Sequence, residues 1–201
     1  MYKICSALGL LVCLSFNTAE TSLSKKEKKN AVTYFKETEK ALIKEVKGLS
    51  EKQLNWKPAD SVWSVANCLE HITLSEKNLF DWAMTTLKEP ANPAKRAELK
   101  HDDETIKKMI TDRSFKAKAP ENFRPTGQLG NSDKTLSIFK QRRAAAIRYI
   151  QSTNDDLRNH FATTPIGVVD SYQVLLFLAA HSRRHTLQII ELKAMPGFPQ
   201  E

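Results

Sequence analysis

The segment DSYQVLLFLAAHSRRHTLQIIELK, residues 170–193, predicts a helix that carries both apolar and metal-ligating side chains on one face. Residues spaced four and three positions apart form a single stripe along this helix, because this spacing places them on one helix face. The stripe consists of Val174, Leu178, His181, His185, Gln188 and Leu192. Its first half is aliphatic, whereas its second half replaces aliphatic residues with two imidazoles and an amide. We therefore expect the helix to lie inside a bundle with His181 and His185 facing inward.

Two histidines four positions apart on a helix lie about 5–6 Å apart at Cβ. Their ring nitrogens can therefore reach one cation at about 2.0–2.1 Å. A stable site needs a third ligand, and the other histidines are His71, His101 and His160. Among these, His71 lies well inside another amphipathic segment. The alternative is that His181 and His185 are a polar pair that caps or bridges one end of the bundle.

Length and composition indicate one all-α domain. The chain has 201 residues, enough for a sizeable core, and only 6 glycines, and its patterned stretches have a helical period. The net charge of +8 comes from lysines spread among acidic residues without interleaved aromatic residues, as in residues 24–29. We interpret this charge as solvated helix faces and expect no nucleic-acid partner. Contact with an anionic envelope surface is the alternative.

Residues 1–21 have the pattern of a secretory signal peptide, which leaves a mature domain over residues 22–201. Lys3 is followed by an apolar run, Ile4–Phe16, that is too short to span a bilayer. We expect an exported protein, periplasmic or extracellular, that is not stably inserted in a membrane after processing. The alternative is an uncleaved membrane anchor. Cys68 is the one cysteine of the mature chain, so no internal disulfide forms, and we expect it to be a small buried side chain.

Apolar periodicity and capping residues predict the helices. The expected ranges are 25–47, 65–88, 103–113, 133–152 and 170–193. Ser64 and Asp170 are the expected N-caps of their helices, and Ser132 or Asp133 is expected to cap the helix over 133–152. Ser50–Gln53 has the pattern of a capping box for one short turn.

The connections between these helices are expected to be irregular. Residues 114–131 contain two prolines and two glycines, which indicates a functional loop or a crossover. Asp155–Phe161 is expected to form a turn of helix, and Thr163–Gly167 a loop. Arg142 and Arg143 are expected to be solvated, with the approach to a bound anion as the alternative.

Four segments together resemble a known family. They are residues 63–71 (WSVANCLEH), 180–188 (AHSRRHTLQ), 49–58 (LSEKQLNWKP) and 124–127 (RPTG). Taken in their order along the chain, they resemble the DinB-like superfamily, also called damage-inducible and YfiT-like metalloenzymes. The resemblance covers about residues 29–193. It implies a four-helix bundle with up-down-down-up connectivity, in which residues 89–131 supply the long crossover between the second and third helices.

The resemblance also implies a divalent metal ion bound by His71, His181 and His185. Glu76 matches an acidic residue that often follows the first ligand by five positions. Asn67 stands where many members have an acidic residue, which puts any role of that position in doubt. The resemblance further suggests a homodimer.

Three neutral imidazoles leave an open coordination position, which is the arrangement of catalytic rather than structural sites. Imidazole suits several transition metals, and we expect zinc or nickel. A water molecule or a thiol at the open position would become more acidic and thereby a nucleophile. Glu76 is a candidate proton acceptor or supporting carboxylate, and Gln188 a candidate for orienting a ligand or water. A buried structural carboxylate and an interhelical hydrogen bond are their respective alternatives.

These observations favour an exported metal-dependent hydrolase that acts on a small-molecule substrate. The family that this chain resembles also includes thiol S-transferases. Their cofactors, bacillithiol and similar thiols, are cytosolic, whereas this chain is expected to leave the cytosol. A non-catalytic metal-binding module is a further alternative, and a deep pocket beside the open position would distinguish an enzyme from it. If the three histidines did not converge, the chain would be a bundle without a metal.

Overall fold

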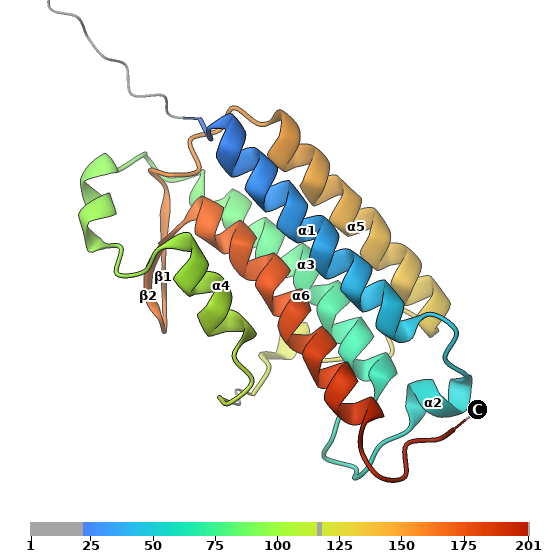
Figure 1. Ribbon diagram of the computed structural model, residues 1–201. Helices are drawn as coiled ribbons and strands as arrows, with labels where there is room; N and C mark the ends of the chain where they lie inside the picture. Colours follow the sequence, from blue (N-terminus) through green and yellow to red (C-terminus); the bar gives the residue numbers. More distant parts are fainter. Residues whose placement is uncertain (1–21, 116–117, 201) are drawn as a thin grey trace, which may run out of the picture.

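The computed structural model describes residues 22–115 and 118–200, and its long helices form a four-helix bundle (Figure 1). The bundle consists of α1 (Lys25–Val46), α3 (Val65–Thr86), α5 (Ser132–Ser152) and α6 (Ser171–Lys193). Helices α3 and α5 run antiparallel to α1, and α6 returns parallel to it (Figure 1). This up-down-down-up connectivity confirms the predicted fold. Helices α1 and α3 each pack against both α5 and α6.

Because α3 and α5 are parallel, the chain must return along the length of the bundle between them. The crossover contains the 3₁₀ helix η1 (Pro93–Glu98), α4 (Asp103–Thr111) and the 3₁₀ helix η2 (Glu121–Phe123). Helix α4 packs against α6, and η2 contacts α3. The crossover therefore passes beside both helices that carry the candidate metal ligands.

The helix starts follow the predicted capping chemistry with one exception. The Ser64 hydroxyl accepts the Asn67 N–H, and the Asp170 carboxylate accepts the Gln173 N–H. Ser50 forms a capping box at the start of the short helix α2 (Glu51–Asn55). The prediction for α5 was wrong by one residue, because the side chain of Asn131 accepts the Lys134 N–H.

Residues 161–170 form a short hairpin in place of the predicted loop, and residues 155–160 form an irregular turn instead of the predicted turn of helix. Strand β1 (Phe161–Thr164) pairs antiparallel with β2 (Gly167–Asp170). Gly167 has a φ of 110°, a conformation that glycine adopts without steric cost and that the tight turn requires. The hairpin leads directly into α6, so it fixes where that helix begins.

Arg143 is completely buried, which corrects the prediction that it would be solvated. Its guanidinium donates to both carboxylate oxygens of Glu76 and to the Ser182 hydroxyl. It also donates to the Thr38 hydroxyl and to the carbonyl oxygen of Phe35. A buried charge is tolerated when it is paired and fully hydrogen-bonded, and this network satisfies both conditions. Arg143 thereby connects all four helices of the bundle.

None of the described helices is long and apolar enough to cross a membrane. The predicted signal peptide, residues 1–21, lies outside the described residues, and so that prediction is not tested by the fold.

Candidate metal centre

Three histidines from two antiparallel helices converge between α3 and α6. The Nε2 atom of His71 lies 3.3 Å from Nε2 of His181 and 3.1 Å from Nε2 of His185. His71 and His185 are buried, whereas His181 is partly exposed. The predicted convergence is therefore present, and a bundle whose histidines lie apart is excluded.

The hydrogen bonds at Nδ1 of His71 and His185 determine which nitrogen of each ring carries the proton. Nδ1 of His71 lies 2.6 Å from the carbonyl oxygen of Phe123, and Nδ1 of His185 lies 2.8 Å from Oε1 of Gln188. Both oxygens can only accept, so each neutral ring must carry its hydrogen on Nδ1. The Nε2 atoms of His71 and His185 then face each other with bare lone pairs. Such a contact is repulsive unless a cation lies between them.

The geometry and the electrostatics of the cluster fit a divalent metal ion. Two imidazole nitrogens at about 2.0–2.1 Å from one tetrahedral ion lie about 3.3 Å apart, close to the separations seen here. Burial lowers the pKa of all three rings, and repulsion from the neighbouring rings lowers the pKa of His181 and His185 further. The pKa of His185 falls to about 3. The rings therefore stay neutral, as metal ligands must be, and protons do not take the place of a metal at neutral pH.

No fourth side chain among the described residues joins the three histidines as a ligand. Cys68 lies one turn before His71, but it is fully buried, and burial raises the pKa of its thiol to about 12. Cys68 is therefore the buried small side chain that its position predicted. A metal ion at this cluster would therefore have three side-chain ligands from the described residues.

Aromatic rings surround the histidines. The centre of the Trp63 ring lies 4.8 Å from that of His71, and Phe177 stacks on His181 with ring centres 6.1 Å apart. Nδ1 of His181 is buried without a hydrogen-bond partner among the described residues. Two cavities found in the described part of the chain are lined by other residues, so neither is the deep pocket that would identify an enzyme.

Comparison with known proteins identifies the family. A model of the DinB superfamily matches residues 34–189, which includes all three histidines and most of the bundle. The chain belongs to the DinB superfamily. It is 27% identical over 165 residues to the uncharacterized protein YuaE of Bacillus subtilis (strain 168), covering 81% of this chain and 96% of YuaE.

A solved structure supports the fold. YfiT from Bacillus subtilis superposes with a TM-score of 0.57 at 18% identity, covering 86% of this chain and 89% of YfiT. YfiT is described as a probable metal-dependent hydrolase with an unusual four-helix bundle topology. At this level of identity the likeness establishes the bundle, in agreement with the DinB assignment.

Gln188 contacts one of the three histidines directly. Its Oε1 accepts from Nδ1 of His185 and, at 3.3 Å, from the Arg113 guanidinium. Arg113 in turn forms an ion pair with Glu191. These contacts can fix both the ring plane of His185 and its tautomer. The role of Gln188 in orienting a ligand stays a prediction.

Replacement of Gln188 by alanine is expected to weaken metal binding about 10–100-fold, the usual cost of losing a partner that orients a ligand. Competition with a chromophoric chelator would measure the affinity. Gln141→Ala, on the exposed face of α5, is the matched control and should bind metal as the parent does. Equal affinities for all three proteins would show that Gln188 does not orient His185.

The contacts of Glu76 and Asn67 differ from those of Gln188. Glu76 is buried and bonds to Arg143 and Ser182. Burial raises its pKa, although the Arg143 charge opposes that effect. Its role as a proton acceptor stays a prediction. Asn67 belongs to the cap of α3, because its Oδ1 accepts the Ser64 N–H.

One contributor to the cluster could not be found from the sequence. The carbonyl oxygen of Phe123, at the end of η2, holds the His71 ring. Every residue has a backbone carbonyl, so the residue type does not reveal this contact. The one indication in the sequence is that Phe123 directly precedes the Arg124–Gly127 segment, which resembles other DinB proteins.

Proposed function

We propose that this DinB protein is a metal-dependent hydrolase that holds a divalent ion with His71, His181 and His185. One observation carries the proposal. The Nε2 atoms of His71 and His185 lie 3.1 Å apart while both Nδ1 atoms are bonded to acceptors. This arrangement presents lone pairs, not protons, to the space between the rings.

The number of ligands supports a catalytic rather than a structural site. A divalent ion with three protein ligands acts as a Lewis acid and lowers the pKa of a bound water to about 7. Gln188 and the carbonyl of Phe123 hold two ligand rings in place before the reaction. Trp63 and Phe177 lie against the rings of His71 and His181.

The hydrolase class is supported by the description of YfiT and by the absence of a fourth ligand among the described residues. Zinc or nickel is the proposed metal, because both bind imidazole well. The substrate is proposed to be a small molecule. Export and a homodimer are parts of the proposal that rest on the sequence and on the family resemblance.

The test is hydrolysis by the purified protein loaded with zinc or nickel, assayed against a panel of nitrophenyl carboxylate and phosphate esters. We expect turnover that requires the metal and that His181→Ala abolishes. His101→Ala, which changes a histidine outside the cluster, should retain it. Metal binding with no ester hydrolysis, but with transfer of a small thiol to an electrophile, would replace the hydrolase with an S-transferase. Metal binding with neither activity would leave a binding module.

A further inference from the structure

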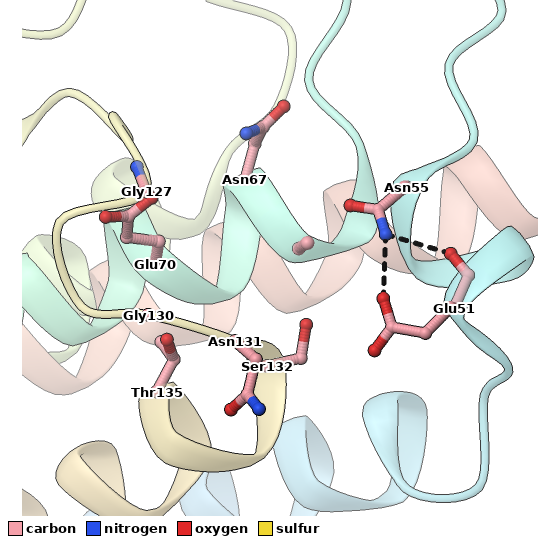
Figure 2. Close-up of a pocket in the computed structure, with 10 residues that line it drawn as sticks. Glu51, Asn55, Asn67, Glu70, Gly127, Gly130, Asn131, Ser132 and Thr135 are labelled. Atoms are coloured by element: carbon pink, nitrogen blue, oxygen red, sulfur yellow. Dashed lines mark hydrogen bonds between the residues drawn. The ribbon is translucent and has the colours of Figure 1, made fainter.

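A polar cavity lies on another side of α3, between α2, the turn before α5 and the first turn of α5 (Figure 2). Its volume is about 160 Å³, which is enough for a molecule of a few heavy atoms. Its walls include Glu51, Asn55, Glu70, Gly127, Ser132 and Thr135. None of the three converging histidines lines it, so it is separate from the proposed metal centre.

Glu70 places a buried carboxylate at this cavity without a cationic partner. The residue is only 5% exposed. Its two oxygens accept the N–H groups of Gly127 and Leu129, at 2.8 and 3.3 Å. Within the described part of the chain, no lysine, arginine or histidine forms an ion pair with it. Buried carboxylates are almost always paired with a positive charge, so the missing partner of Glu70 indicates a cation that enters from outside.

The hydroxyl of Thr135 is a further polar group at the same cavity. The residue is 2% exposed, yet its hydroxyl forms no hydrogen bond with another described residue and opens onto the cavity. Figure 2 shows Ser132 and Thr135 rising from the first turn of α5 towards α3. Buried hydroxyls nearly always have a partner, so a ligand with its own hydrogen-bonding group would satisfy Thr135.

The negative charge of the side chains that line the cavity favours a positively charged ligand. Glu51 adds a second carboxylate, and the lining contains no lysine, arginine or histidine although the chain has a net charge of +8. Asn55 donates to Glu51 through Nδ2, which leaves its Oδ1 able to accept (Figure 2). The N-terminus of α5 contributes about half a positive charge, which is less than the two carboxylates. Lys134 is not part of the lining, but both its alkyl chain and its ammonium lie near Gly130 at the rim of the cavity.

We propose that this cavity binds a small hydroxyalkylamine, a molecule that carries a primary ammonium group and a hydroxyl. The ammonium pairs with Glu70 within the field of Glu51, because it supplies the positive charge that the neutral donors to these carboxylates do not provide. The hydroxyl of the ligand bonds to Thr135 or Ser132. This site depends neither on the metal nor on the proposed hydrolase activity.

Ethanolamine is a suitable probe, since it is protonated at about pH 7 and has both groups. Nuclear magnetic resonance of the isotope-labelled, metal-loaded protein would follow the amides of Gly127, Leu129 and Thr135 during titration. We expect saturable shifts there and unchanged signals at His181 and His185. Ethylene glycol, its neutral counterpart, and tetramethylammonium, which has no donor, should produce no saturable shift.

Thr135→Val keeps the shape of the side chain and is expected to weaken ethanolamine binding roughly tenfold, as is Glu51→Gln. Thr33→Val, on the exposed face of α1, should bind ethanolamine as the parent does, and all three variants should retain their metal. The proposal would be overturned if ethanolamine caused no saturable shift or shifted the histidine signals instead. Equal binding of ethylene glycol, or full binding by Thr135→Val and Glu51→Gln, would also overturn it.

Discussion

Protein purified without a histidine tag is expected to contain close to one equivalent of divalent metal, and the His181→Ala/His185→Ala variant none. The variant keeps only His71, whose Nε2 atom faces both replaced rings. We expect its affinity to fall by more than about 100-fold, because removing a ligand costs more than removing a residue that only orients one. Elemental mass spectrometry would measure the metal content of both proteins.

The control for that experiment is the double variant His101→Ala/His160→Ala, which removes two histidines outside the cluster and should keep its metal. Circular dichroism would show whether each variant retains its helices. If the parent contained no metal even after incubation with zinc and nickel, the metal centre and the proposed hydrolase would both be wrong. The ethanolamine site would be unaffected by that result.

Replacement of Arg143 by methionine is expected to lower the free energy of unfolding by about 3–5 kcal/mol, the usual cost of removing one partner from a buried ion pair. The variant leaves the Glu76 carboxylate buried without a charge to balance it. It also removes the donors that Ser182 and Thr38 accept from in the parent. Urea denaturation followed by circular dichroism would measure the change.

Arg142→Met is the matched control, since Arg142 is the neighbouring arginine and forms one hydrogen bond, to the Thr73 carbonyl. It should destabilise the protein much less than Arg143→Met. Adding Glu76→Gln to Arg143→Met should restore part of the stability, because no uncompensated charge then remains in the core. Equal unfolding energies for the two arginine variants would show that the buried network does not stabilise the bundle.

The helices of the bundle could be predicted because each carries its own local evidence. Ser64 and Asp170 begin their helices where the capping pattern indicated, and the apolar stripe of α6 faces the core. The meeting of His71 with His181 and His185 followed from the resemblance rather than from spacing. Spacing alone relates residues within one helix, and His71 belongs to another.

Features that depend on distant partners could not be predicted. Arg143 is buried because Glu76, 67 positions away in the chain, neutralises it. In the sequence, Arg143 and Glu76 were each only a charged residue within or beside the apolar stripe of a helix. The hairpin was missed because strands β1 and β2 have four residues each, too few for an alternating pattern to stand out. Glu70 was missed because its partners are backbone N–H groups.

The order of the helices determines when the metal centre can form during biosynthesis. His71 and His181 are 110 positions apart, and α6 follows the other helices of the described residues. Closing so long a loop costs entropy that only the docking of α6 recovers, so this contact forms late in folding. Until α6 has docked, His71 lies without His181 and His185, and the three-histidine cluster is incomplete. The proposed metal centre can therefore form only after α6 has docked against α3.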